Sequence, residues 1–208
     1  MKARSKKFFA VLLAAAMLVS TFAIGCGSED KPTETVNKFC TSLLAYDIKT
    51  AVSYTNDTSS NDSLDLDAQI DSDAGKVILN CVKELAKKNS FKITNEEKTD
   101  ATHYKVTVTF TLQNLSTLQN LITTELSTLV KDLYSSTGSA LNANNEEDYK
   151  KIVELMGDAS NKVVKEHTFA TESYDISFNL EKVNDKWLIM DPDSSQMTHI
   201  LMMGISGL

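Results

Sequence analysis

Two segments of the chain alternate between apolar and polar residues. The apolar positions are Tyr104, Val106, Val108, Phe110 and Leu112 in the first segment, and Tyr174, Ile176, Phe178 and Leu180 in the second. Such alternation predicts strands with one apolar face and one polar, solvated face. Each strand has a predicted partner: residues 91–98 lie before the first across a turn at Asp100, and Asn184-Asp185 leads from the second into residues 186–191. The pattern therefore predicts two antiparallel hairpins.

Helical spacing predicts three elements before the first hairpin. Pro32 opens the first helix, because its fixed φ suits the first turn. Asp47 is placed to cap a short second helix, and Ser72 or Asp73 a third. Residues 55–71, rich in Asp, Ser and Asn, are predicted to form a loop before the third helix.

Two more helices are predicted between the hairpins, within residues 116–166. Ser116 is placed to cap the first, whose stripe runs from Leu118 to Leu133. After the last strand, the apolar tail Met197–Leu208 is predicted to fold back as a covering helix. A dimer or protein-partner surface is the alternative for this tail, because Met-rich patches adapt to partners. This order of elements predicts an α+β fold with an antiparallel sheet.

The start of the chain has the three zones of a secretory leader. Four basic residues precede an apolar run over residues 8–23, and Ala23-Ile24-Gly25-Cys26 follows. This tetrapeptide resembles the bacterial lipobox. The resemblance implies that residues 1–25 are removed and that Cys26 carries diacylglycerol and palmitate, which anchor the protein to the extracytoplasmic face of the cell membrane. The alternatives are an uncleaved anchor helix, and cleavage after Ala23 that releases a soluble protein.

We expect residues 26–31 to form a short tether and residues 32–208 a single α+β domain, with 116–166 as a helical insertion. Removing the four basic leader residues from the 21 in the chain leaves 17 against 28 acidic ones, a net charge of −11. Arg4 is the only arginine, so the mature protein has no guanidinium group to bind phosphate. These features argue against nucleic acid as a partner, and against an electrostatic hold on anionic lipid.

Two cysteines remain beside Cys26. Cys40 and Cys81 lie on the apolar stripes of predicted helices, where a free cysteine behaves as a small hydrophobe. We favour two buried thiols. A Cys40–Cys81 disulfide is the alternative, since an extracytoplasmic protein permits one.

Both ends of the mature chain resemble a known fold. The spacing of its first helices, Pro32-x3-Val36-x2-Phe39-x3-Leu43-x3-Asp47-x3-Ala51-x2-Tyr54, and its last strand, with Lys186-Trp187-x-Ile189, resemble the nuclear transport factor two-like fold. They are most similar to small bacterial lipoproteins of that fold labelled lumazine-binding or of unknown function. The resemblance implies a curved sheet wrapped by helices into a cone that binds a small apolar ligand. Tyr104, Phe110, Tyr174, Phe178 and Trp187 are the candidate pocket residues, and the alternative is that they fill the core.

Candidate catalytic and metal residues form no recognised motif. His103 and Asp175 fall on polar strand faces, while His167 and His199 stand apart from them and from each other. The acidic run from Asp62 through Asp65, Asp67 and Asp71 to Asp73 lacks the Gly and Glu of a calcium loop. We therefore expect a non-catalytic domain without metal or cofactor that binds a small apolar ligand or a protein partner, including a second copy of itself. An enzyme of the same fold acting on a small apolar substrate is the alternative.

Overall fold

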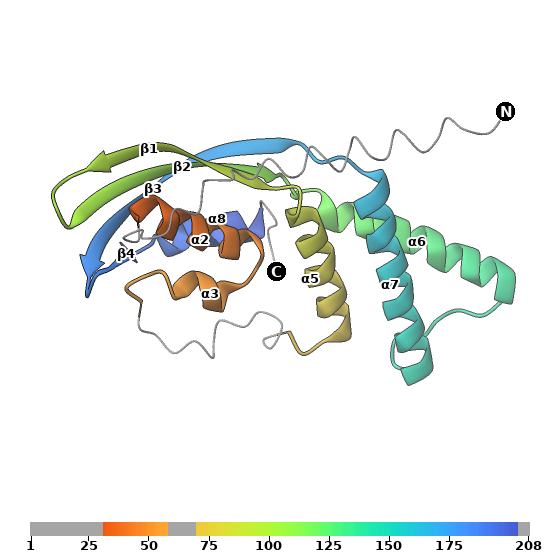
Figure 1. Ribbon diagram of the computed structural model, residues 1–208. Coiled ribbons are helices and arrows are strands. Elements are labelled where there is room, and N and C mark those ends of the chain that lie inside the picture. The colour runs from red at the N-terminus through yellow and green to blue at the C-terminus, as the bar shows by residue number, and fades with distance from the viewer. Residues whose placement is uncertain (1–30, 58–69, 204–208) are drawn as a thin grey trace, which may run out of the picture.

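The computed structural model describes residues 31–57 and 70–203 of the 208-residue chain. Its elements confirm the predicted α+β fold (Figure 1). In chain order they are α2 (Pro32–Leu44), α3 (Ile48–Val52), α5 (Asp73–Ala86), β1 (Ser90–Lys98), β2 (His103–Gln113), α6 (Leu118–Thr137), α7 (Glu146–Glu166), β3 (Thr171–Val183), β4 (Lys186–Met190) and α8 (Ser194–Met202).

The four strands form one antiparallel sheet in the order β1-β2-β3-β4. In its centre Val106 of β2 lies opposite Phe178 of β3, and Val108 lies opposite Ile176. Because side chains alternate along a strand, this register puts the predicted apolar positions of both strands on one face. The opposite face carries hydroxyl pairs such as Thr107 with Ser177, whose oxygens are 2.9 Å apart.

The two edges of the sheet differ. Along β4 the backbone of residues 54–56 continues the hydrogen bonding: Ile189 N–H donates to the Tyr54 carbonyl, and Asn56 N–H donates to the Ile189 carbonyl. At the other edge, β1 contains a bulge between Ile93 and Asn95. Bulges and exposed charges discourage an edge strand from pairing with another chain.

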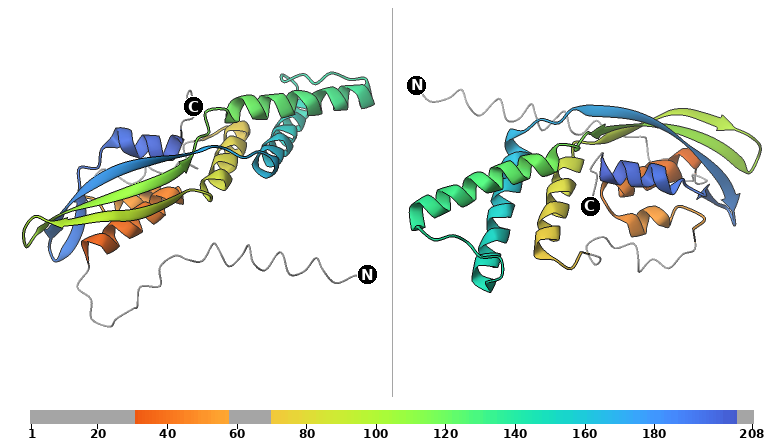
Figure 2. Two further views of the ribbon diagram at one scale, coloured as in Figure 1. Left: turned by 90° about the horizontal axis from the view of Figure 1, so that it is seen from above. Right: turned by 180° about the vertical axis from the view of Figure 1, so that it is seen from behind.

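Three helices cover the apolar face of the sheet. α2, α3 and α8 lie together on that side, while the other face has no helix among the described residues (Figures 1 and 2). Phe39 of α2 packs edge-on against Phe178, with 5.4 Å between ring centroids. We call this core the sheet cluster. Its buried residues are Val36, Phe39, Cys40, Leu43, Ala51, Val106, Val108, Phe110, Leu112, Ile176, Phe178, Leu180, Trp187, Ile189 and Ile200.

A second core lies beyond the end of the sheet, where α5 packs on α7 and α7 on α6. The resemblance implied that the N-terminal helices wrap the sheet, but α5 belongs mainly to this second core. An ion pair between Lys162 Nζ and Glu125 Oε2, at 2.6 Å, also joins α7 to α6. We call this core the helical cluster. Its buried residues are Cys81, Val82, Leu85, Ala86, Leu115, Leu118, Ile122, Ala159, Val163, Phe169 and Met203.

The end of α8 connects the two clusters. Ile200 is buried in the sheet cluster and Met203 in the helical cluster. Tyr46, which follows α2, donates from its hydroxyl to the Leu201 carbonyl at 2.5 Å. Leu115 N–H donates to the Met203 carbonyl at 2.7 Å. The predicted covering helix is therefore present, and it bridges two cores instead of covering one.

Local capping explains most helix starts. Asp47 accepts from Thr50 N–H at the start of α3, as predicted, and Ser72 accepts from Gly75 N–H at the start of α5. The predicted Ser116 cap is wrong, because α6 begins one residue later behind Thr117, whose side chain makes no capping bond. Instead, Asn114 Oδ1 accepts from Ser116 N–H in the turn before the helix.

Candidate functional site

The predicted anchor, Cys26 with the leader 1–25, lies outside the described residues. What the structure does show is the start of the folded chain: α2 begins at Pro32, directly after the predicted tether. Within residues 31–57 and 70–203, none of the helices combines the length and the apolar character that crossing a membrane requires.

The five candidate pocket residues share the apolar side of the sheet, where most of them are packed. Phe110 has no exposed surface, Phe178 is 3% exposed and Trp187 is 7% exposed. Tyr104 packs edge-on against Trp187, with 5.1 Å between ring centroids. Apart from Phe178, none of the five lines either of the two surface hollows described below. Ring-on-ring contacts therefore hold Tyr104 against Trp187 and Phe178 against Phe39.

Tyr174, like Tyr104, is less buried than the other three candidate pocket residues. It is half-buried, and its ring lies edge-on to His199 of α8, with 4.3 Å between centroids. Its hydroxyl donates to Glu172, which also accepts from Asn114 Nδ2. The hydrogen bond to the Glu172 carboxylate raises the pKa of Tyr174. These contacts tie β3 to its neighbours at the protein surface.

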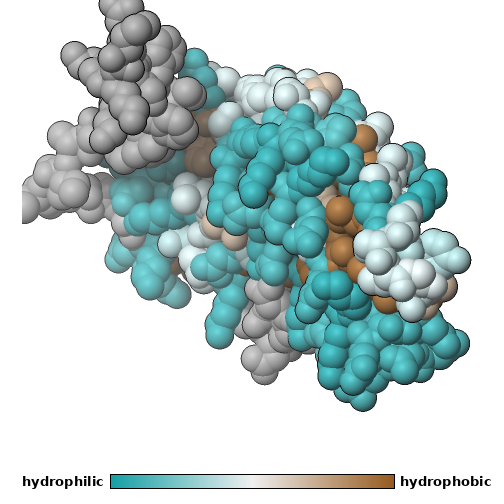
Figure 3. Space-filling view, turned by 90° about the vertical axis from the view of Figure 1, so that its right-hand side faces the viewer, coloured by the Kyte–Doolittle hydropathy of each residue, from teal (hydrophilic) through white to brown (hydrophobic). Residues whose placement is uncertain are grey.

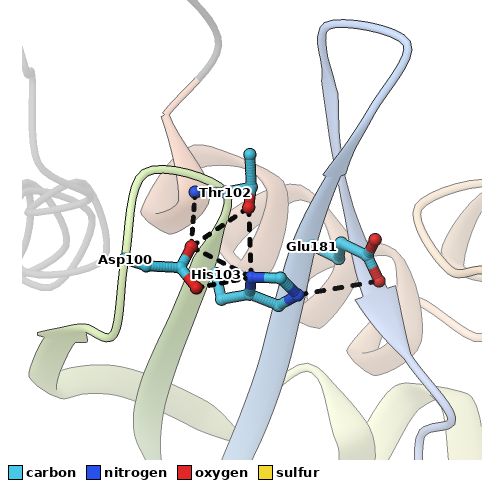
Figure 4. A network of polar contacts seen from close by, with 4 residues as sticks. All are labelled: Asp100, Thr102, His103 and Glu181. Atoms are coloured by element: carbon cyan, nitrogen blue, oxygen red, sulfur yellow. Dashed lines mark hydrogen bonds and ion pairs between the residues drawn. The ribbon is translucent and has the colours of Figure 1, made fainter.

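A titratable network stands at the turn between β1 and β2 (Figure 4). Asp100 Oδ2 lies 2.9 Å from His103 Nδ1, and Glu181 Oε2 of β3 lies 4.0 Å from His103 Nε2. Asp100 Oδ1 also accepts from Thr102 N–H at 2.7 Å and from the Thr102 hydroxyl at 3.0 Å. The backbone bond from Thr102, followed by the bond to His103, lowers the pKa of Asp100 to about 2.

These contacts stabilise the β1–β2 turn, and we call Asp100, Thr102, His103 and Glu181 the turn clasp. The His103, Asp100 and Glu181 side chains are between 40% and 54% exposed, so water competes for every contact. Thr102 shares His103 Nδ1 with Asp100, and neither surface hollow includes these residues. An Asp–His pair becomes catalytic when it serves a nucleophile or base that faces bound substrate.

The other predicted polar residues are not brought together. Asp175 accepts from Thr109 on the open sheet face at 2.5 Å. His167 ends α7, and His199 lies on α8 against Tyr174.

Of the acidic run, Asp62, Asp65 and Asp67 lie outside the described residues. Asp71 and Asp73 are exposed, and Asp73 stands in the first turn of α5, where a carboxylate interacts favourably with the helix dipole. The part of the chain that the structure describes contains no group of three His, Cys, Asp or Glu residues that could hold a metal ion.

Both remaining cysteines are free and buried, so the alternative of a Cys40–Cys81 disulfide is not found in the structure. Cys40 belongs to the sheet cluster and Cys81 to the helical cluster. Burial raises the pKa of Cys40, and it raises that of Cys81 to about 11 against a smaller opposing effect of Ser160. Such thiols are protonated at neutral pH and react slowly.

The most exposed large hydrophobic side chain among the described residues, that of Tyr134, lies on α6, where no site was predicted. Leu126, Val130 and Tyr134 follow one another at intervals of four residues and form a line that we call the α6 ridge. Tyr134, at its far end, is 55% exposed. Figure 3 views the molecule from this end and shows apolar surface between hydrophilic areas.

A hollow of about 450 Å³ adjoins the α6 ridge. Val130 and Tyr134 line one side of it, and Ala140 and Leu141 from the α6–α7 loop line the other. The sequence contains a signal for this surface. At 100° per residue, Tyr134 lies about 140° around α6 from Leu129, so the apolar stripe of the second half of the helix is wide.

A second hollow, of about 250 Å³, lies where β3 and β4 meet the start of α8. It is polar, but its carboxylates already have structural partners. Asp191 has a positive φ of 43° and exchanges two hydrogen bonds with Asn56. Asp193 caps α8 by accepting from Ser195 and Gln196 N–H groups. These residues shape a tight connection, and we assign no ligand to it.

No family model and no curated protein matches the chain. Among solved structures, it is similar to ycdA from Bacillus subtilis subsp. subtilis str. 168, a protein that its description assigns provisionally to the lipoproteins. The two chains are 18% identical and superpose with a TM-score of 0.45, over 76% of this chain and 50% of the other. The chain therefore spans about half the length of that protein.

Proposed function

We propose that this protein is a lipoprotein held at the extracytoplasmic face of the membrane by Cys26, and that its domain binds a protein partner without catalysing a reaction. The anchor rests on the basic, apolar and lipobox zones that end at Cys26. Two acyl chains give a stable attachment where a single chain would give only a reversible one.

The packed apolar face of the sheet is the observation that favours a protein partner over a small apolar ligand. Phe110, Phe178 and Trp187 expose less than a tenth of their surface and contact other core side chains. A site for a small apolar ligand is usually a concave cavity that buries most of the ligand. The rings occupy that place themselves.

The α6 ridge is the surface that we assign to the partner. Tyr134 lines a hollow together with three apolar residues and the polar Lys131, Ser135 and Ser139. Exposed tyrosines beside partly apolar recesses are typical of the centres of protein interfaces. A second copy of the chain is one partner that this surface would fit.

The proposed anchor has a direct test. Replacing Cys26 by Ala removes the only sulfur that the lipobox offers, so the variant should leave the membrane fraction and enter the medium or periplasm. Metabolic labelling with palmitate should mark the parent protein and not the variant. Absence of the palmitate label from the parent protein would contradict lipid anchoring.

The proposed partner surface is tested by photo-crosslinking in living cells. A photoreactive residue at position 134 should give a protein adduct, whereas one at exposed Asp132, two residues away and nearly opposite on the helix, should not. Val130→Glu should abolish the adduct at position 134, because it introduces a charge into the apolar recess. Equal yields at the two positions would contradict a role for the ridge.

Native mass spectrometry distinguishes the other functions. A retained small molecule would favour the ligand-binding role or the alternative of an enzyme with a small apolar substrate.

We propose kinship with the nuclear transport factor two-like fold on the strength of α2, which lies across the apolar face of an antiparallel sheet. The α6–α7 pair between β2 and β3 departs from that pattern, in which strands follow one another directly.

A further inference from the structure

Three separate parts of the chain meet at one end of the sheet. The β1–β2 turn lies beside the β3–β4 turn, because Lys182 N–H donates to the Thr102 carbonyl at 2.9 Å. The start of α2 joins them, since the Thr35 hydroxyl donates to the carbonyl of Trp187, two residues after the second turn. Both views in Figure 2 show this end opposite the α6–α7 hairpin. We call it the turn end, comprising residues 31–38, 97–105 and 181–187.

The molecule is elongated along the line from the turn end to the α6–α7 hairpin. β2 starts at the turn end and has 11 residues, so it spans roughly 36 Å. α6 continues away from the sheet for 20 residues, which is roughly 30 Å (Figure 1). The α6–α7 loop therefore lies on the order of 60 Å from the turn end.

The length of the predicted tether limits where the membrane can lie. Six peptide units join Cys26 to Pro32, and a fully extended chain of this length reaches at most about 20 Å. The start of α2 must stay within that distance of the lipid anchor, and the turn end is the part of the described domain that adjoins it. This reach is about a third of the distance to the α6–α7 loop.

Charge also distinguishes the turn end. It carries six lysines and five carboxylates, whereas the mature chain as a whole has a net charge of −11. The lysines are Lys31, Lys38, Lys98, Lys105, Lys182 and Lys186, and the carboxylates are Glu34, Glu97, Asp100, Glu181 and Asp185. The excess of negative charge therefore lies elsewhere in the mature chain, so an anionic bilayer does not repel this end through its net charge.

The apex of the turn end also offers an apolar contact. Val183, at the β3–β4 turn, is 36% exposed and is one of two large hydrophobic residues classed as exposed among the described residues. Lys182 precedes it and Lys186 lies opposite it on β4. Lys182 pairs with Asp185 at 3.6 Å, while the stem of Lys186 can lie along the apolar surface as its ammonium group reaches phosphate.

We propose that the turn end is the membrane-facing surface, with Val183 and its flanking lysines against the lipid headgroups, and that the α6 ridge is presented away from the bilayer. This inference rests on the proposed anchor at Cys26. It gives the tethered domain one orientation. In this orientation the proposed partner site lies far from the lipid, where other components of the cell envelope can reach it.

Energy transfer to the bilayer tests this orientation. The full-length lipidated protein is reconstituted in vesicles of phosphatidylcholine with a minor fraction of phosphatidylglycerol that contain an acceptor-labelled lipid. A donor dye is attached at Val183→Cys in one preparation and at Ser139→Cys, exposed in the α6–α7 loop, in another. Protein without an added cysteine controls for labelling of buried Cys40 and Cys81. We expect strong transfer from position 183 and weak transfer from position 139.

The outcomes separate the two proposals. Equal transfer from both positions, or stronger transfer from position 139, overturns the orientation while the anchor stands. A preparation that does not stay with the vesicles, and behaves like the Cys26→Ala protein, overturns the anchor and the orientation with it. Strong transfer from position 183 alone supports both.

Discussion

At the scale of single residues, the aromatic side chains beneath the sheet determine how this domain is interpreted. Phe110 has no exposed surface and lies in the second half of β2, with Phe91 of β1 at 6.0 Å between ring centroids. A residue that lines an empty pocket can be trimmed at little cost, whereas one that fills a core cannot. The difference is measurable in a single variant.

Phe110→Ala should lower the free energy of unfolding by about 3–5 kcal/mol, because it leaves a cavity in a packed core. Urea denaturation followed by circular dichroism measures this loss. Tyr134→Ala is the matched control: this side chain is mostly exposed and should cost much less. Similar small losses for both variants would indicate that the face beneath the sheet is a ligand pocket.

The turn clasp gives a prediction for pH. The pKa of Asp100 is lowered in the folded state to about 2, from an ordinary value of 3.8, so its charged form stabilises the fold above pH 4. This stabilisation is lost as the pH falls from about 4 towards 2. Asp100→Asn should therefore lower the urea midpoint at pH 7. The difference in urea midpoint between the variant and the parent protein should become smaller as the pH falls below 4.

Asp185→Asn in the neighbouring turn provides the comparison, because its side chain is 99% exposed and its ion pair with Lys182 spans 3.6 Å. Such an exposed pair contributes little to stability. The role assigned to the Asp100 carboxylate would be contradicted by a difference in urea midpoint between Asp100→Asn and the parent that is the same at pH 7 and at pH 3.

At the scale of elements, two glycines in the α6–α7 pair should respond in opposite ways to the same change. Gly138 ends α6 with a φ of +71°, a conformation that side chains with a Cβ disfavour. Gly138→Ala should cost roughly 1 kcal/mol, even though an added Cβ would meet no atom within 4 Å. Gly157→Ala, inside α7 with similarly open space, should stabilise by roughly 0.5–1 kcal/mol. Thermal unfolding of both variants checks the opposite signs.

Strand alternation made the sheet predictable. One face of β2 and of β3 is apolar and the other is polar. A register shifted by one residue would bring the apolar residues of one strand to the solvent face, so the observed pairing buries the apolar residues of both strands. The helices were also foreseen, along with the Asp47 and Ser72 caps, because these depend on local sequence. What a helix packs against depends on the whole fold, and the apolar stripe of α5 is equally suited to a sheet or to another helix.

The candidate site could be predicted only in part. An inward-facing aromatic residue looks the same in sequence whether it lines a cavity or fills one, since both need the same alternation. The α6 ridge was missed because its residues read as one wide apolar stripe, and only the position of α7 shows which of them remain uncovered. Cys26, by contrast, depends on the sequence alone.

At the scale of the whole molecule, α8 joins two cores, and the buried thiols report on each. Cys40 monitors the sheet cluster and Cys81 the helical cluster. Ending the chain at Asp193 removes Ile200 from the first and Met203 from the second. Both thiols should then react with a maleimide far faster than in the intact protein, as measured by mass spectrometry. Exposure of Cys40 alone would show that the clusters are stable independently.

The pairing of α2 with the last part of the chain has a consequence for biogenesis. Thr35 bonds to Trp187 across 152 positions, and Tyr46 bonds to Leu201 across 155. The sheet cluster therefore cannot close until nearly the entire polypeptide is available, and loop closure over such separations slows folding. If the proposed export occurs, this delay would keep the polypeptide unfolded until the segment that carries Leu201 has been translocated.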